Sequence, residues 1–280
     1  MVLGTDLTGK MAVVTGAGGI LCGMFARTLA RAGAAVALLD INLEAAEETA
    51  RDIREAGGTA AAYGVDVMDK EMLESVHARV LARLGPCDIL INGAGGNQAR
   101  ANTSKEYFEM GDIEADVATF FDMEYKGVQG VLDLNFLGRF LTCQVFAKEM
   151  VGREGCNIIN ISSASAARPL TRIPVYSGAV AALSNFTQWL AVHFAKAGIR
   201  VNAIAPGFFV TRQNEGLLYE EDGKPAARTA KVLAATPMGR FGRPEELNGA
   251  LMFLLNNEAA GFITGIILPV DGGFSAYSGV

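Results

Sequence analysis

The sequence predicts an α/β protein in which a doubly wound, seven-stranded parallel sheet lies between two layers of helices. Short apolar runs of strand length alternate with helical segments along most of the chain, which is the rhythm of a parallel sheet. Polar and glycine-rich residues follow several of these runs, as expected where a ligand binds at the carboxyl edge of such a sheet. Half of the 280 residues are hydrophobic and no linker or repeat divides them, so we expect one domain over residues 1–280.

The N-terminal strand–turn–helix–strand stretch predicts the first half of a dinucleotide-binding unit. Met11–Val14 reads as a buried strand, Thr15–Gly19 as a tight turn, Leu21–Ala32 as a helix and Ala35–Leu39 as a second strand that leads into Asp40. In this arrangement, backbone N–H groups and the positive end of the helix face a pyrophosphate. An acid after the second strand binds the adenosine ribose and repels a 2′-phosphate, so Asp40 favours NAD(H) over NADP(H). The alternative is that Asp40 only caps the next helix.

The rest of the chain continues the alternation of strands and helices. Helices are predicted at Leu43–Ala56, Lys70–Leu84, from Pro174 onward and at Pro244–Asn256, and strands at Thr59–Val67, Cys87–Ile91, Asn157–Ile161, Arg200–Ala205 and Ile266–Val270. This order places Asp66, Asn92 and Gly93–Gly96 at the carboxyl edge of the sheet, where ligands bind.

Composition and charge exclude several classes of protein. The net charge is −6 without a basic run, which argues against a nucleic-acid partner. The N-terminus lacks a signal pattern, and polar residues such as Ser184, Gln188 and His193 interrupt the most apolar helix, so no membrane span is expected. The four cysteines are scattered and only two histidines accompany them, so we expect a reduced, cytoplasmic protein without a metal site.

Motifs along essentially the whole chain resemble the short-chain dehydrogenase/reductase family, whose fold is of the Rossmann type. The matching pieces are the Thr15-Gly16 turn, Asp66-Val67, the N-G-A-G at Asn92–Gly95, Asn135 in LNFLG, Ser162-Ser163 after NIINI, Tyr176, Pro206-Gly207 with Thr211, and the closing LPVDGGFSAYSGV. Within the family, the long segment after Gly96 and the runs SNFTQWLAVHFAKAGIRVNAIAPGFF and TPMGRFGRPEEL are similar to the D-mannonate oxidoreductase (fructuronate reductase) branch.

The resemblance implies a set of site residues. Asn135, Ser163 and Tyr176 would be catalytic: Ser163 polarises a carbonyl oxygen and Tyr176 exchanges its proton, while a nicotinamide carries the hydride. The implied cofactor-binding residues are Gly16, Gly18, Gly19, Leu21, Asp40, Asp66, Val67, Asn92, Ala94, Gly95, Tyr176, Pro206, Phe209 and Thr211. The Phe209 backbone would meet the nicotinamide amide, and Thr211 would lie near the phosphates. The implied substrate is a small sugar acid or related carbonyl, and the implied assembly is a homotetramer. The alternative is that Ser163 only caps a helical turn and that Tyr176 is a half-buried residue at an interface.

The chain departs from the family at one position with chemical consequences. The family motif is Tyr-x-x-x-Lys, whereas this chain has Val180 four residues after Tyr176, on the same helix face. The lysine would bond the ribose and stabilise tyrosinate, because a free tyrosine titrates near pH ~10. Val180 does neither, so we expect weak or absent activity, with alcohol oxidation affected more than carbonyl reduction. Arg168 or Arg172 is a possible substitute cation.

A second departure concerns the glycine-rich turn. The family pattern T-G-x-x-x-G-I-G becomes T-G-A-G-G-I-L-C, so Ile20 and Cys22 replace two glycines while Gly18, Gly19 and Gly23 are gained. Because the length is kept, we expect the turn to survive with its flexibility moved earlier and with the helix slightly farther from the strand.

Two segments are candidates to cover the substrate, and four arginines are candidates to bind it. The acidic insertion at about 97–130 is interpreted either as a lid or as a solvated or subunit-contact flap, and residues at about 208–237 as a substrate-covering lid. Arg100, Arg172, Arg212 and Arg240 are the candidates to bind a substrate carboxylate, unless they are only surface charges. The leading function is an NAD(H)-dependent sugar-acid oxidoreductase. The alternatives are a reductase for another polyol, ketose or ketone, and a catalytically silent nucleotide-binding protein.

Overall fold

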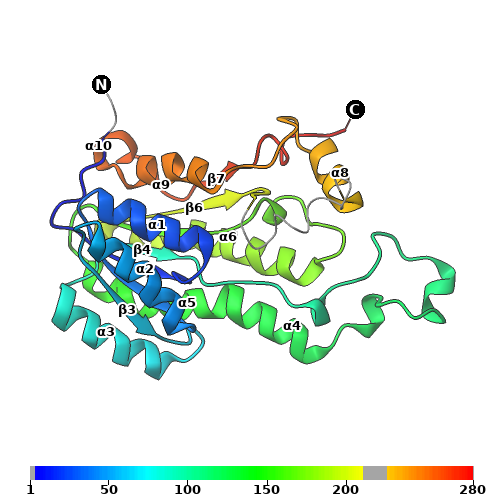
Figure 1. Cartoon of the computed structure of the whole chain (residues 1–280), viewed down its shortest axis with the longest axis horizontal. Helices are drawn as coiled ribbons and strands as arrows, with labels where there is room; N and C mark the ends of the chain where they lie inside the picture. The colour runs from blue at the N-terminus through cyan, green and yellow to red at the C-terminus, as the bar shows by residue number, and fades with distance from the viewer. Residues whose placement is uncertain (1–3, 211–225, 280) are drawn as a thin grey trace.

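A seven-stranded parallel sheet lies between two layers of helices in the computed structural model, which describes residues 4–210 and 226–279 (Figure 1). The strands are β1 Met11–Thr15, β2 Ala35–Asp40, β3 Ala60–Gly64, β4 Ile89–Asn92, β5 Cys156–Ile161, β6 Ile199–Pro206 and β7 Ile267–Val270. Their order in the sheet is β3-β2-β1-β4-β5-β6-β7, and every neighbouring pair is parallel. The predicted three-layer, doubly wound fold is therefore confirmed. The order reverses between β1 and β4, where a ligand is expected to bind.

The helices are α1 Ile20–Arg31, α2 Leu43–Glu55, α3 Lys70–Leu84, α4 Tyr125–Leu132, α5 Gly138–Phe146, α6 Pro174–Phe194, α8 Ala227–Ala234, α9 Leu247–Leu255 and α10 Asn257–Ala260. Helices α1, α2, α3 and α6 lie close to the predicted positions, whereas no bounds were predicted for α4, α5 and α8. The predicted last helix, Pro244–Asn256, is divided into a 3₁₀ turn at Pro244–Glu246, then α9 and α10. Asn256 makes the second break, because its side chain accepts the N–H groups of Glu258 and Ala259 and so starts a new helix.

The inner strands bury both of their faces, which explains their continuous apolar runs in the sequence, whereas the edge strand β7 is only partly buried. In β1, Ala12 and Val14 belong to one core and Met11 and Val13 to the other, because successive side chains of a strand point in opposite directions. The first core is closed by α1, α2 and α9, and the second by α3, α5 and α6. The predicted third strand ends at Gly64 rather than Val67, since β2 offers no paired residue beyond Asp40.

A π-helical segment, Asp133–Leu137, connects α4 to α5 and was not predicted. The N–H of Gly138 donates to the carbonyl of Asp133, five residues earlier, which widens the helix by one residue. Such single-turn π segments occur frequently at functional sites. Here the segment carries Asn135, whose side chain is fully buried.

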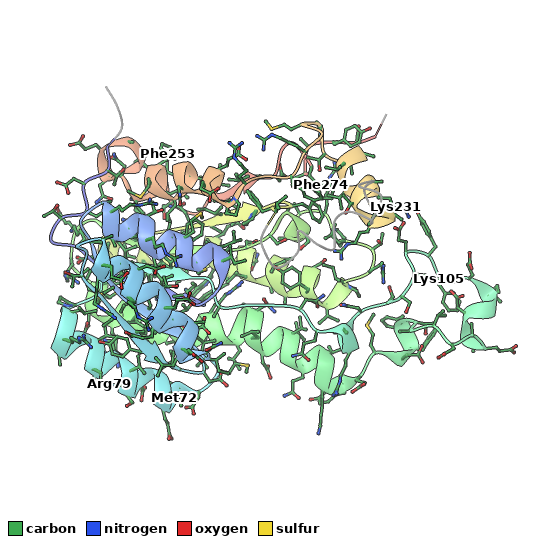
Figure 2. The ribbon with its side chains drawn as sticks, in the orientation of Figure 1. Met72, Arg79, Lys105, Lys231, Phe253 and Phe274 are labelled. Carbon is green, nitrogen blue, oxygen red and sulfur yellow. The ribbon has the colours of Figure 1, made fainter. Side chains whose placement is uncertain are left out.

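The acidic insertion leaves the domain after β4 and returns at α4. It extends beyond the sheet as an irregular arm with 3₁₀ turns (Figure 1). Lys105, labelled in Figure 2 on the outer part of this arm, forms ion pairs with Glu109 (2.7 Å) and Asp112 (2.6 Å). The insertion exposes apolar side chains, including Phe120 and Phe121. Over the described ranges, no helix has both the length and the apolar character needed to cross a bilayer.

Candidate active site

A cleft of about 550 Å³ lies at the carboxyl edge of the sheet, at the reversal point between β1 and β4. Nine predicted cofactor-binding residues line it: Gly16, Gly18, Gly19, Leu21, Asp40, Asp66, Val67, Ala94 and Gly95. The glycine-rich turn therefore survives its two substitutions. Cys22 also lines the cleft, and its sulfur fills the space beside Gly93, where a Cβ would lie 2.0 Å away. Burial raises the pKa of the Cys22 thiol to about 12, so this group remains uncharged.

Asp40 is held in a fixed orientation at the entrance of this cleft. Its Oδ2 accepts the Gly18 N–H (2.9 Å) and its Oδ1 accepts the Asn42 N–H (2.8 Å). The cap of the following helix is a different residue, Asn42, whose side chain accepts the Ala45 N–H at 3.2 Å. The alternative in which Asp40 serves only as a helix cap is therefore wrong.

The inner wall of the cleft is fixed by Thr15 at the end of β1. Its hydroxyl accepts the N–H groups of Gly93 (3.0 Å) and Ala94 (3.1 Å), which joins the loop after β4 to the glycine-rich turn. Asn92 does not face the cleft with its side chain, which is fully buried and donates to Asn160 Oδ1 at 3.0 Å. Asn92 can therefore contribute to cofactor binding only through its backbone.

The cleft fits an extended nucleotide because side chains are missing where the walls come closest. A Cβ on Gly16 would lie 2.9 Å from the Ala94 backbone, and one on Gly18 would lie 2.8 Å from the Ala45 Cβ. Gly16 also has φ +69°, a conformation that favours glycine. The N-terminus of α1 adjoins this turn, and its first N–H groups have no partners within the helix, which suits a pyrophosphate.

Ser163 follows β5 and is positioned as a hydrogen-bond donor. Its Oγ accepts the Ser165 hydroxyl (2.9 Å) and the Ser165 N–H (3.2 Å), which leaves the Ser163 proton available for a ligand. The residues that follow form a short 3₁₀ turn, Ala164–Ala166, which packs against α6.

Tyr176 lies in the first turn of α6, which Pro174 starts as predicted. Its half-buried ring packs beside Ala101, Val131 and Ala179. Within the described part of the chain its hydroxyl has no hydrogen-bond partner. The two hydroxyl-bearing residues of the predicted pair thus stand on elements in direct contact, which is the arrangement expected for polarising and protonating a carbonyl.

Asn135 fixes the loop that connects the cleft with this pair. Its Oδ1 accepts the Gly96 N–H (3.1 Å), while its Nδ2 donates to the carbonyls of Gly96 (2.6 Å) and Val131 (2.8 Å). Each polar atom of the Asn135 amide is therefore used within the protein. The π-helical turn supplies the bend that lets this side chain reach the loop.

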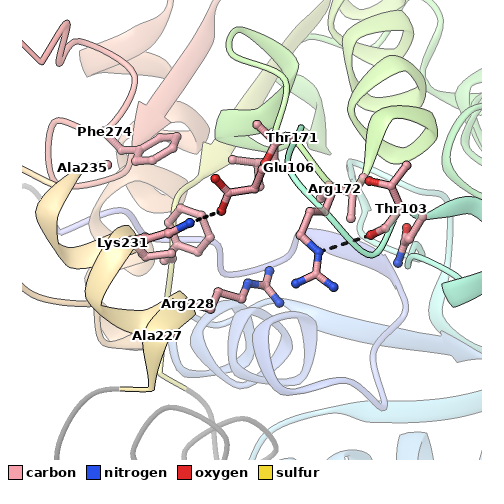
Figure 3. A pocket seen from close by; sticks show the side chains of 14 residues that line it. Thr103, Glu106, Thr171, Arg172, Ala227, Arg228, Lys231, Ala235 and Phe274 are labelled. Carbon is pink, nitrogen blue, oxygen red and sulfur yellow. Dashed lines mark hydrogen bonds and ion pairs between the residues drawn. The ribbon is translucent and has the colours of Figure 1, made fainter. Parts of the chain in front are cut away.

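A second cavity, of about 390 Å³, adjoins the start of α6 and carries excess positive charge. Figure 3 shows the guanidinium groups of Arg172 and Arg228 close to each other, with Lys231 bound to Glu106 (2.7 Å). Among the described residues that line the cavity, the one acid is therefore paired, and neither arginine has an acidic partner there. The cavity is bounded by the base of the insertion, the segment before Tyr176, and α8, so the insertion forms part of a pocket wall.

The other arginines predicted for a carboxylate are placed differently. Arg100 pairs with Glu124 at 3.5 Å, and Arg240 pairs with Glu246 at 2.8 Å. The hydrogen bond from Arg240 lowers the pKa of Glu246 to about 2. Arg212 and Thr211 lie outside the described residues, as does much of the predicted lid. Pro206 ends β6, and the side chain of Phe209 is buried against Gly242, while the backbone contact predicted for Phe209 stays a prediction.

Comparison with known proteins shows which family has this sequence pattern. A protein-family profile described as enoyl-(acyl carrier protein) reductase matches residues 19–275. An uncharacterized oxidoreductase from Haemophilus influenzae is 54% identical, over 98% of this chain and 96% of its own length. The chain belongs to the short-chain dehydrogenase/reductase family.

Solved structures of dehydrogenases share the fold over nearly the whole chain. A proposed D-mannonate oxidoreductase from Haemophilus influenzae, with bound NAD, has a TM-score of 0.96 and 53% identity, covering 99% of both chains. A proposed 2-deoxy-D-gluconate 3-dehydrogenase from Agrobacterium tumefaciens, with bound NADP, has a TM-score of 0.80 and 32% identity, covering 98% of this chain and 99% of its own. This short-chain dehydrogenase/reductase is therefore an oxidoreductase whose relatives bind both nicotinamide cofactors.

Position 180, where the resemblance predicts a lysine, carries an apolar residue in this short-chain dehydrogenase/reductase. Val180 is fully buried, and its carbonyl accepts the Ser184 hydroxyl at 2.9 Å. Each suggested substitute has a hydrogen-bond partner elsewhere: Arg168 donates to the Tyr277 carbonyl, and the Arg172 Nε donates to the Thr103 carbonyl at 3.2 Å. The sequence reasoning missed Arg228 and Arg139. Arg228 could have been found from the sequence because it follows a polar stretch at the start of a helix. Arg139 could have been found because it lies one helical turn after Asn135.

Proposed function

We propose that this short-chain dehydrogenase/reductase interconverts a ketone and a secondary alcohol of a sugar acid, of the fructuronate/mannonate type, with NAD(H). The observation that carries the proposal is the cavity that adjoins the start of α6, which Arg172 and Arg228 both line and in which the one acid among the described lining residues, Glu106, is paired with Lys231. Two guanidinium groups are suited to hold a carboxylate, which accepts hydrogen bonds from both. The high identity to a proposed D-mannonate oxidoreductase supports the same substrate class.

A bound nicotinamide would supply the hydride, and residues of the chain would manage the proton. In reduction, Ser163 donates a hydrogen bond to the carbonyl oxygen, and Tyr176 gives its phenolic proton to that oxygen. In oxidation, Tyr176 accepts the proton of the substrate hydroxyl. Asn135 positions the loop that separates this pair from the nucleotide cleft.

Asp40 supports a preference for NADH over NADPH. Its carboxylate faces the cleft in a fixed orientation, where it suits ribose hydroxyls and repels a 2′-phosphate. Because a hydrogen bond to a charged group contributes about 1.5–3 kcal/mol, we expect NADH to bind roughly 10- to 100-fold more tightly than NADPH. Fluorescence titration measures both constants. Asp40→Asn should shrink the ratio, whereas Asp52→Asn on the surface of α2 should leave it unchanged. A wild-type protein that prefers NADPH would contradict the assignment.

The substrate proposal is tested through the two pocket arginines. Arg172→Gln and Arg228→Gln should each raise the KM for fructuronate by about 10- to 100-fold, since each removes a charge-assisted hydrogen bond. NADH affinity should stay unchanged, because neither residue lines the nucleotide cleft. Arg100→Gln, an exposed arginine outside the pocket, is the matched control. An unchanged KM in both variants would exclude the pocket as the carboxylate site.

Val180 favours a second candidate, a nucleotide-binding protein without turnover. That alternative predicts NADH binding but no reduction of any ketose, sugar acid or ketone. An NADH titration paired with a fructuronate reduction assay separates it from the enzyme. Association into a homotetramer and a cytoplasmic location remain predictions. The first is supported by Trp189 and Val192, which are exposed on α6.

A further inference from the structure

An ion pair between Glu106 and Lys231 lines the same cavity as Arg172 and Arg228. Glu106 belongs to the acidic insertion and Lys231 to α8, and the Lys231 Nζ donates to the Glu106 Oε1 at 2.7 Å. In Figure 3 these two side chains point toward each other and lie apart from the two guanidinium groups. The cavity therefore presents two separate polar groups, a guanidinium pair and a carboxylate–ammonium pair.

The carboxylate–ammonium pair keeps hydrogen-bonding capacity that the protein does not use. The Lys231 ammonium has three N–H donors, and Glu106 takes one of them. The Glu106 Oε2 has no hydrogen-bond partner among the residues that the structure describes. The side chains of Glu106 and Lys231 are 33% and 67% exposed, and an ion pair with this exposure contributes little to the stability of a fold. Stability therefore does not explain why the pair lies in the cavity wall, and both side chains are accessible to a ligand.

The base of the insertion also orients the guanidinium of Arg172. The Thr103 N–H donates to the Arg172 carbonyl at 3.1 Å, and the Arg172 Nε donates back to the Thr103 carbonyl at 3.2 Å. Over the described ranges, the two terminal nitrogens of Arg172 have no partner, so the fork that suits a carboxylate is presented to the cavity. The insertion thus sets the positions of Arg172 and of Glu106 in one wall.

The charges of the cavity restrict the ligand that can meet both polar groups. A cationic group on the ligand would be repelled by Lys231, Arg172 and Arg228, and a second carboxylate would be repelled by Glu106. A hydroxyl is neutral and both donates and accepts, so neighbouring hydroxyls suit an acceptor and a donor that lie side by side. Because Lys231 compensates the charge of Glu106, this acid does not oppose a carboxylate held by the arginines.

We propose that Glu106 and Lys231 are the specificity-determining residues that select the hydroxyl groups of the substrate chain. This inference rests on the proposed function, in which Arg172 and Arg228 bind the carboxylate of a sugar acid. The Glu106 Oε2 accepts a hydrogen bond from one hydroxyl and the Lys231 Nζ donates to another, while the ion pair between them stays intact. An acid of the same length without these hydroxyls leaves both groups unused, so the site discriminates against it.

The test measures binding to the NADH complex, so it does not depend on the rate of turnover. Isothermal titration compares two ligands, mannonate and 5-hydroxyhexanoate. The second ligand keeps the carbon chain, the carboxylate and the hydroxyl at the reacting carbon, and it lacks the other hydroxyls. Neither ligand can accept a hydride from NADH, so only affinity is recorded. The wild-type protein should bind mannonate about 10- to 100-fold more tightly than 5-hydroxyhexanoate, as expected for charge-assisted hydrogen bonds to hydroxyls.

The decisive variant is Glu106→Leu combined with Lys231→Met, which removes both polar groups and keeps the net charge of the cavity. Mannonate affinity should fall about 10- to 100-fold, whereas 5-hydroxyhexanoate affinity should not fall, so the discrimination is lost. The matched control is Arg100→Met with Glu124→Leu, an exposed ion pair of the same insertion outside the cavity, which should keep both affinities. Melting temperatures identify variants that fail to fold, and the isosteric Glu106→Gln, which should lower the affinity ratio several-fold, then provides the comparison.

Arg172→Gln separates a failure of this proposal from a failure of the proposed function. It removes a contact to the carboxylate that both ligands share, so it should weaken both by the same factor and keep their ratio. If Arg172→Gln does so while the double variant at Glu106 and Lys231 keeps the wild-type ratio, the hydroxyl role is wrong and the sugar-acid assignment stands. If the wild type binds neither ligand, or if Arg172→Gln changes neither affinity, the sugar-acid assignment is wrong and the hydroxyl role is wrong with it.

Discussion

Tyr176→Phe should lower kcat for carbonyl reduction by about 100- to 10,000-fold, the usual contribution of a positioned proton donor. The reason is that the phenolic hydroxyl is the proton source in the proposed reaction. The substitution removes only that hydroxyl, and the ring keeps its packing beside Ala101, Val131 and Ala179. Folding and NADH affinity should therefore change little. Steady-state kinetics with NADH and fructuronate, together with an NADH titration, measure the two effects separately.

The matched control is Tyr63→Phe, a buried tyrosine on β3, far along the sheet from the Ser163 turn. It removes the same hydroxyl group and should leave kcat within about twofold of wild type, since β3 lies at the opposite edge of the sheet and contributes nothing to proton transfer. If Tyr176→Phe retained more than about a tenth of wild-type kcat, another group would be the proton donor and the proposed chemistry would be wrong.

Gly16→Ala should weaken NADH binding by about 100-fold. Alanine at this position has two difficulties: the backbone has φ +69°, and the new Cβ would lie 2.9 Å from the Ala94 backbone. A left-handed conformation costs an L-residue about 1–2 kcal/mol, and the close contact forces the turn and the loop after β4 apart. Losing two hydrogen bonds to a charged pyrophosphate, at about 1.5 kcal/mol each, corresponds to roughly that factor.

Gly57→Ala separates the two causes, because Gly57 has φ +85° and nothing within 4 Å of its would-be Cβ. This variant should lose about 1 kcal/mol of unfolding free energy and keep its NADH affinity. Thermal unfolding and isothermal titration of both variants make the comparison. Equal NADH affinities in the two variants would mean that the turn at Gly16 does not set the width of the cleft.

Much of the fold was predictable because its determinants are local. The apolar runs, the helix starts such as Pro174 and the helix stops such as Gly33 act within a few residues of themselves. The cofactor cleft was predictable for a related reason: a parallel sheet brings the ends of its strands to one edge, so Asp40, Asp66 and Gly95 had to meet there.

The residues that the sequence did not reveal depend on contacts between distant segments. Arg139 looks like an ordinary helix arginine until the loop after β4 is seen to cover it. Arg228 and Arg172 are 56 positions apart, and only the packing of α8 against the segment before Tyr176 brings them to one cavity. The π-helical turn at Asp133–Leu137 was equally hidden, because its wider winding serves the buried amide of Asn135 rather than any periodic pattern.

One wall of the pocket that contains Arg172 and Arg228 is formed by the acidic insertion, which is joined to α8 by the Glu106–Lys231 ion pair. The proposed hydride and proton exchange, by contrast, uses groups at the sheet edge and on α6, where the insertion contributes only apolar packing from Ala101 against the Tyr176 ring. The choice of molecule and the reaction carried out on it are thus encoded in separate stretches of polypeptide. Substitutions in the insertion would then change which substrate is preferred while the catalytic residues stay the same, so substrate preference would be able to evolve separately from the reaction.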